Sequence, residues 1–179
     1  MRKRGILCFV VLFLLSGCSK RNTADKEFTN TYNSFVESIM DNKGTISSDI
    51  PFSYTMKVEK QSNHTYYYDV TIDQTRIAMY NIQMMIVDKN AGGDYPFIGL
   101  LPDEDVYAMI PNQENKDKNF VKGITLGGVS SSPAFELQVM VRWKDYAQVN
   151  TSTIFFTLTY DEQAQPADDT APADDTVVE

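Results

Sequence analysis

Apolar and polar residues alternate with a period of two along most of the chain between residues 54 and 160. The alternation is clearest in residues 135–144 and 154–160, and it also occurs in residues 54–59, 66–73 and 80–86. Residues 105–110 and 120–126 show it more weakly. Such a period predicts strands that bury one face and expose the other.

Polar and glycine-containing segments separate these strands and predict loops at residues 60–64, 88–96, 112–119 and 145–150. About seven short strands joined in this way are typical of a two-sheet antiparallel β-sandwich, with a barrel as the alternative. The predicted fold is therefore mainly β, with a single sandwich domain over residues 51–160. A segment of that size is long enough to form one hydrophobic core.

A different period marks the segment before the strands. Its apolar residues recur at intervals of three and four, at Phe28, Tyr32, Phe35, Val36, Ile39 and Met40. This spacing predicts an amphipathic helix over residues 25–43, capped by Asp25 or Thr23 and followed by Gly44. The helix packs on the domain or lies on a bilayer. Packing is favoured because the polar face lacks the Lys and Arg of membrane-surface helices.

The late strands carry a resemblance to a known fold. Ile124, one residue, Leu126 and two glycines precede a short loop and the long alternating strand from Phe135. This order resembles the late strands of immunoglobulin-like and fibronectin-type domains. The resemblance implies an immunoglobulin-like sandwich, although the chain has no cysteine pair in this region and Phe135 stands nearest to the position of the tyrosine corner.

The N-terminus has the parts of a bacterial export signal. Arg2, Lys3 and Arg4 precede the apolar run 6–15, which is shorter than the roughly 20 residues that span a bilayer. Leu15, Ser16, Gly17 and Cys18 then match the lipobox, in which small residues precede an obligatory cysteine.

This lipobox and the strand-rich body resemble the small surface lipoproteins of low-GC Gram-positive bacteria. The resemblance implies that residues 1–17 are a cleaved lipoprotein signal peptide and that the Cys18 sulfur carries diacylglyceryl. The mature protein would then be held at the extracytoplasmic face of the cell membrane, since two or more acyl chains anchor a protein stably. Residues 18–24 are expected to form a polar tether.

Charge narrows the range of partners. The chain has a net charge of −8, and removal of Arg2, Lys3 and Arg4 makes it −11. Residues 161–179 contain acidic residues, no basic residues and a near-repeat of Pro-Ala-Asp-Asp-Thr, so a disordered acidic tail is expected there. Nucleic acid is excluded as a partner because phosphate binding needs clustered Lys and Arg.

The residues offer little for catalysis or metal binding. Cys18 would be acylated, and the single histidine, His64, falls in a predicted loop without a nucleophile beside it. The segment from Asp88 to Gly93 departs from a calcium loop at its fifth and twelfth positions. Asp103, Glu104 and Asp105 read as a turn rather than a metal site. No catalytic residue, metal site or cofactor is therefore predicted.

One motif indicates recognition. Within a strand, Tyr66 and Tyr68 point to one side and Tyr67 to the other, so either the pair or Tyr67 is exposed and available to stack on a sugar or a protein partner. Met79, Met85, Met140 and Phe155 fall on the outer side of their strands. They form an exposed apolar patch or, as we favour, lie under the N-terminal helix.

These observations predict a non-enzymatic lipoprotein that binds or scaffolds a protein or glycan of the cell envelope. The alternative is a small hydrolytic or carbohydrate-active domain, with Tyr67 and an acidic pair such as Asp103 and Asp105 near one cleft.

Overall fold

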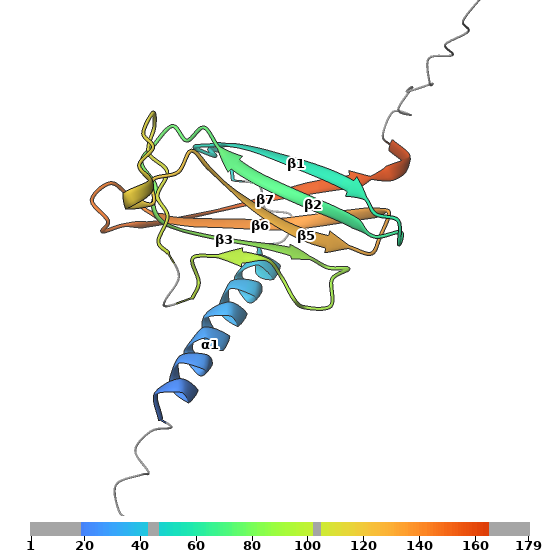
Figure 1. Ribbon diagram of the computed structural model, residues 1–179, viewed down its shortest axis with the longest axis horizontal. Helices are drawn as coiled ribbons and strands as arrows, with labels where there is room; N and C mark the ends of the chain where they lie inside the picture. Colours follow the sequence, from blue (N-terminus) through green and yellow to red (C-terminus); the bar gives the residue numbers. More distant parts are fainter. Residues whose placement is uncertain (1–18, 43–46, 102–104, 165–179) are drawn as a thin grey trace, which may run out of the picture.

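The computed structural model describes residues 19–42, 47–101 and 105–164 (Figure 1). The predicted signal peptide, including Leu15, Ser16 and Gly17, and the predicted acylation site Cys18 lie outside these residues. The elements are α1 (Ser19–Asp41), β1 (Ser53–Lys60), β2 (Tyr66–Asp73), β3 (Tyr80–Asp88), β4 (Phe97–Ile98), the 3₁₀ turn η1 (Lys116–Lys118), β5 (Gly123–Ser130), β6 (Ala134–Lys144), β7 (Thr151–Asp161) and the 3₁₀ turn η2 (Glu162–Ala164).

The strands form two antiparallel sheets, in the orders β1-β2-β5 and β4-β3-β6-β7. Each sheet also pairs strands that are not consecutive in the sequence, β2 with β5 and β3 with β6. The predicted β-sandwich is confirmed, and the strands do not close into a barrel.

The main core lies between the sheets and follows the alternation in the sequence. Val70 and Ile72 of β2 face Val139 and Val141 of β6 across the sandwich, and all four side chains are at most 1% exposed. The intervening residues on β2 point outward and are half-buried or exposed. The period-two pattern therefore assigned the buried face of these strands correctly.

Three strand predictions need correction. Residues 105–110 make isolated bridges, Met79 with Met109 and Ala108 with Phe120, instead of a regular strand. The two-residue strand β4 carries too little alternation to be visible in the sequence. β5 continues through Gly127 and Gly128 to Ser130, beyond the end predicted at residue 126. The glycines are inside the strand because the tyrosines of β2 occupy the space where their side chains would stand.

A second core lies outside the sandwich, between α1 and the outer face of the four-stranded sheet. Phe35 and Ile39 pack there with Met85, Val87 and Met140, and each of these side chains is at most 2% exposed. The Arg142 guanidinium also stacks 4.4 Å from the centre of the Phe35 ring. The helix thus packs on the domain, as favoured above, and it covers Met85, Met140 and Phe155.

Met79 does not belong to this second core. It is fully buried in the core between the sheets. The reason is an irregularity in the pairing of β3 with β6 between Tyr80 and Gln83, where Asn81 has a φ of 50°. A bulge of this kind adds a residue to one strand and reverses the side to which the preceding residues point.

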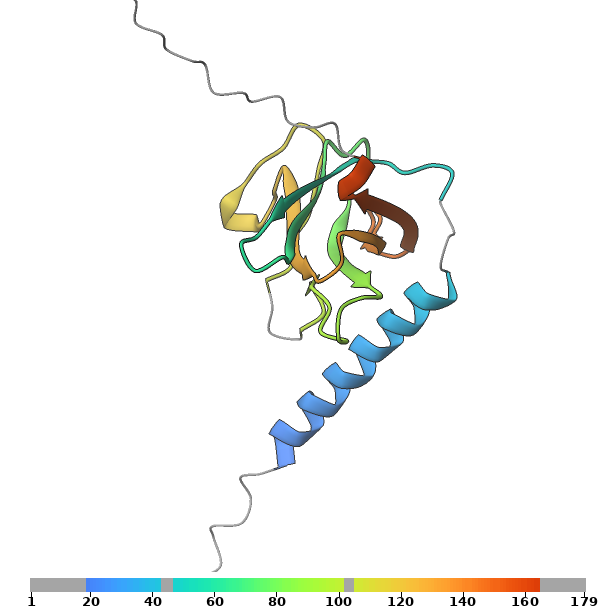
Figure 2. The ribbon, with the colours of Figure 1, turned by 90° about the vertical axis from the view of Figure 1, so that its right-hand side faces the viewer.

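Two predicted boundaries also change. Residues 19–24, expected as a tether, are already helical, because extending an existing helix by a residue gains one backbone hydrogen bond without a new nucleation cost. In both views the N-terminal end of α1 extends away from the sandwich (Figures 1 and 2). The acidic tail was expected to begin at residue 161, yet Asp161 ends β7 and residues 162–164 form η2.

A polar cluster holds η2 against the other sheet. Lys60 Nζ donates to Glu162 Oε1 and the Tyr66 hydroxyl donates to Glu162 Oε2, each at 2.6 Å. These donors, Lys60 first and Tyr66 second, lower the pKa of the Glu162 carboxyl. The cluster therefore ties the β1–β2 hairpin to the end of β7.

Candidate ligand groove on the open sheet face

None of the helices among the described residues covers the outer face of the three-stranded sheet, and this face is mainly polar. The strand register places Thr55, Thr71 and Thr125 side by side, and Lys57 beside Asp69 and Gly127. Most of the outward side chains of β1 are exposed, and those of β2 are half-buried or exposed. This face lies opposite the face covered by α1, because it belongs to the other sheet of the sandwich.

The three consecutive tyrosines divide between the two sides of this sheet. Tyr66 and Tyr68 point into the core and are 3% and 1% exposed, whereas Tyr67 points outward and is 38% exposed. Burial, with a smaller effect of the Asp88 charge, raises the pKa of Tyr68. Of the two alternatives that the sequence left open, Tyr67 is therefore the exposed one, and Tyr66 and Tyr68 are not available on the surface.

Tyr67 is held in place on the open face. Its hydroxyl donates to Asp69 Oδ1 at 2.9 Å, and this hydrogen bond raises the pKa of the Tyr67 phenol. The ring end lies over Gly127, where a Cβ would overlap the phenol oxygen. Gly128 is covered on the inner side by Tyr68 in the same way. The glycine pair thus makes room for one tyrosine on each side of β5.

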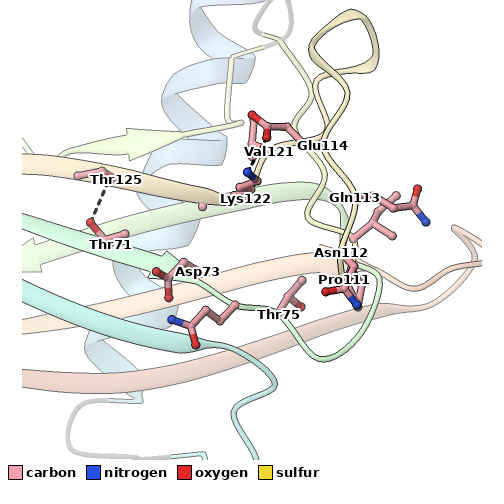
Figure 3. A pocket seen from close by; sticks show the side chains of 13 residues that line it. Thr71, Asp73, Thr75, Pro111, Asn112, Gln113, Glu114, Val121, Lys122 and Thr125 are labelled. Atoms are coloured by element: carbon pink, nitrogen blue, oxygen red, sulfur yellow. Dashed lines mark hydrogen bonds and ion pairs between the residues drawn. The ribbon is translucent and has the colours of Figure 1, made fainter.

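A groove of about 1050 Å³ opens at the other end of the same face (Figure 3). One wall comes from the strands, through Thr71 and Asp73 of β2 and Thr125 of β5, and the other from the loop between β4 and β5. Further lining residues are Gln74, Thr75, Ile110, Pro111, Asn112, Gln113, Glu114, Val121, Lys122 and Gly123.

The groove contains both paired and unpaired polar groups. The Thr71 and Thr125 hydroxyls share a hydrogen bond of 2.8 Å, and Lys122 Nζ lies 2.9 Å from Glu114 Oε2, which lowers the pKa of that carboxyl. By contrast, the side chains of Asp73, Gln74, Asn112 and Gln113 have no hydrogen-bond partner among the residues that the structure describes. One carboxylate and three amides are thus free to bind a ligand.

Backbone conformation sets two groove residues apart. Gln74 and Asn112 have φ values of 46° and 59°, in the left-handed region. Asn tolerates this region, but for Gln it costs free energy that the surroundings must offset. Such conformations concentrate at binding sites and turns. Here Gln74 directly follows β2, and Asn112 lies in a turn of the loop between β4 and β5.

The other residues considered from the sequence do not form a site with this groove. His64 lies in the β1–β2 turn, at the opposite end of the sheet, with a φ of 63°. Asp105 is exposed and lines no part of the groove, and Asp103 and Glu104 lie outside the described residues. Within the described ranges, no three His, Cys, Asp or Glu side chains come close enough to hold a metal ion.

The predicted loop at residues 112–119 supplies Asn112, Gln113 and Glu114 to the groove. Nothing in the sequence pattern indicates that this loop folds beside the ends of β2 and β5. Of the helices that the structure describes, none is both long enough and apolar enough to cross a membrane.

No protein-family model matches this sequence, and no curated protein matches it. The X-ray structure of Northeast Structural Genomics Consortium target SoR45 is similar over 67% of this chain and 94% of that chain, with 17% sequence identity and a TM-score of 0.39.

Proposed function

We propose that this protein is a lipoprotein that is anchored through Cys18 at the extracytoplasmic face of the bacterial cell membrane and binds or scaffolds another envelope component. The observation that carries the proposal is the order of the first 18 residues: a basic start, a short apolar run and the sequence Leu15, Ser16, Gly17, Cys18. We propose no catalytic activity.

The position of α1 supports a binding role for the open face. α1 begins at Ser19, directly after the proposed anchor, and its 23 residues extend about 35 Å. Its C-terminal part packs on the four-stranded sheet through Phe35 and Ile39. A lipid at Cys18 would thus lie on the helix side of the sandwich and leave the three-stranded sheet free to meet a partner.

The anchor is tested by metabolic labelling with an alkyne fatty acid, followed by membrane fractionation. Cys18→Ala should abolish the label and leave an unprocessed precursor or a released protein. Cys8→Ala is the matched control, since it removes the other cysteine of the chain and should leave labelling unchanged. Wild-type labelling of the Cys18→Ala variant would disprove the lipid assignment.

The binding role is tested in intact cells with a photo-crosslinking residue placed at Thr125 on the open face. A discrete crosslinked adduct is expected there. If no adduct forms at this position under any growth condition, the open face has no partner and this part of the proposal fails.

A further inference from the structure

We propose that the groove binds an uncharged glycan chain, which runs along β2 from the groove toward Tyr67. This inference rests on the proposed binding function and names the chemical class of the ligand. It starts from the four side chains in the groove that have no partner among the described residues, Asp73, Gln74, Asn112 and Gln113.

The hydrogen-bonding groups match a ligand rich in hydroxyl groups. Each amide offers two donor hydrogens and an acceptor oxygen, and the Asp73 carboxylate accepts only. A sugar hydroxyl both donates and accepts, so it satisfies amide and carboxylate groups together. Ile110, Pro111 and Val121 also line the groove and offer apolar contacts for the C–H faces of sugar rings.

The charge of the groove argues against an anionic ligand. Lys122 is the only cation among its lining residues, and it is already paired with Glu114 at 2.9 Å. Asp73 then remains as an unneutralised negative charge. Phosphate, sulfate or carboxylate groups on the ligand would be repelled, because binding such groups needs free Lys or Arg.

The position of the groove argues against an added peptide strand. Peptides that extend a sheet use the free backbone groups at its edge. Thr71 and Asp73, however, belong to the central strand β2, whose backbone is paired on both sides. Thr125 belongs to the edge strand β5, but its free backbone groups lie in the plane of the sheet, whereas the groove is formed above the sheet by side chains. A ligand on this face must therefore be recognised through side chains.

Tyr67 provides a place for the glycan to continue. It lies four residues before Thr71 on the same face, about 13 Å along the strand. The hydrogen bond to Asp69 and the contact with Gly127 hold its ring against the sheet. An aromatic ring fixed in this way is a platform on which a sugar ring stacks with little loss of side-chain entropy.

The test uses full-length protein purified in detergent and measures its co-sedimentation with chitin, cellulose and purified bacterial cell walls. Chitotetraose and cellotetraose serve as competing ligands in solution. We expect wild-type protein to bind at least one of these glycans and the matching oligosaccharide to displace it. Absence of binding to all three would overturn the inference.

Variants then locate the site. Gln74→Ala and Asp73→Ala should each weaken binding by about tenfold, because each leaves part of the ligand without its hydrogen bond. Gln148→Ala is the matched control: Gln148 also has a positive φ of 58°, but it lies in the β6–β7 turn. Groove variants that bind as tightly as the Gln148→Ala protein would contradict the proposed site.

Tyr67 is tested separately. Tyr67→Phe keeps the ring and should retain most of the glycan binding. Tyr67→Ala should weaken glycan binding without changing the melting temperature of the protein. Equal binding by both variants would remove Tyr67 from the site and with it the proposed path of the chain.

Two outcomes separate this inference from the proposed function. Binding to cell walls that is lost after enzymatic removal of their peptides would indicate a peptide partner and overturn the glycan inference, while the envelope-binding role would stand. If wild-type protein took up no fatty-acid label, the anchor proposal would instead fail, whether or not the protein binds a glycan.

Discussion

The two outer faces of the sandwich are built on the same strand geometry but differ in their side chains and surroundings. On the four-stranded sheet, Met85, Val87 and Met140 point outward and are fully buried under α1. On the three-stranded sheet, the corresponding outward positions hold Thr55, Lys57 and similar polar residues, which remain exposed. One face is closed by a segment of the same chain, and the other is open to a partner.

The difference shows how a covered face can be recognised in a sequence. β3 contains Met84, Met85, Ile86 and Val87 in succession, so both sides of the strand are apolar. β2 alternates strictly after Tyr68, with Asp69, Thr71 and Asp73 on one side. A strand that is apolar on both sides must be covered on both, and here the amphipathic helix before the domain supplies the cover.

The covered face should depend most strongly on Phe35. Replacing this buried side chain with alanine leaves a cavity between α1 and the sheet, and we expect the free energy of unfolding to fall by about 3–5 kcal/mol. Chemical denaturation measures the change. Met40→Ala, at a position on the same helix that is 43% exposed, should change it by less than about 0.5 kcal/mol. Equal effects would mean that the helix does not pack on the sheet.

Alanine substitutions of Gly127 and Gly128 compare the outer and inner sides of the three-stranded sheet. Gly128→Ala places a methyl group against the buried Tyr68 ring and should lower the free energy of unfolding by about 1–3 kcal/mol. Gly127→Ala places it against Tyr67, which is 38% exposed and can move outward, so we expect a smaller loss. A larger loss for Gly127→Ala would show that Tyr67 is locked as firmly as Tyr68.

An exchange of similar side chains tests the two outer faces directly. Val87→Thr buries a hydroxyl group under the helix and should cost about 1–2 kcal/mol of unfolding free energy. Thr55→Val makes the reverse change on the open face and should have an effect below about 0.5 kcal/mol. Thermal melts measure both changes in stability. Changes of similar size in the two variants would mean that the two faces are equivalent, which would contradict the difference described here.

The polar cluster at Glu162 connects the two sheets and predicts a pH dependence. Because Lys60 and Tyr66 hold the pKa of Glu162 below its ordinary value of 4.5, the cluster stabilises the fold above that pH, and the contribution is lost as pH falls through the lowered pKa. Glu162→Gln should therefore melt below wild type at pH 7, and the difference should vanish in acid. Glu59→Gln, an exposed position on β1, is the control.

The sequence predicted the elements better than it predicted the site. Alternation located β2, β6 and β7 closely, since each buries one regular face. It failed at Met79, where the bulge at Asn81 reverses the pattern, and after residue 126, where β5 continues because Gly127 makes room for Tyr67.

The groove was not predicted because its residues come from separate parts of the chain. Asp73 and Asn112 are brought together by the pairing of β2 with β5 and by the loop before β5. No local pattern encodes that proximity. Tyr67 was identified from the sequence as a candidate, but only the register showed that it shares a face with the groove.

Labelling of single cysteines on intact cells, with a maleimide that does not cross membranes, tests the anchor, the location and the covered face together. Acylation of Cys18 and removal of Cys8 would leave the mature protein without a free thiol, so wild type should stay unlabelled. Thr55→Cys, on the open face, should label on intact cells, and Val87→Cys, under α1, only after denaturation. Labelling of the wild type would contradict the proposed anchor. A Thr55→Cys protein that labels only after lysis would contradict the proposed location, and rapid labelling of native Val87→Cys would contradict the covered face.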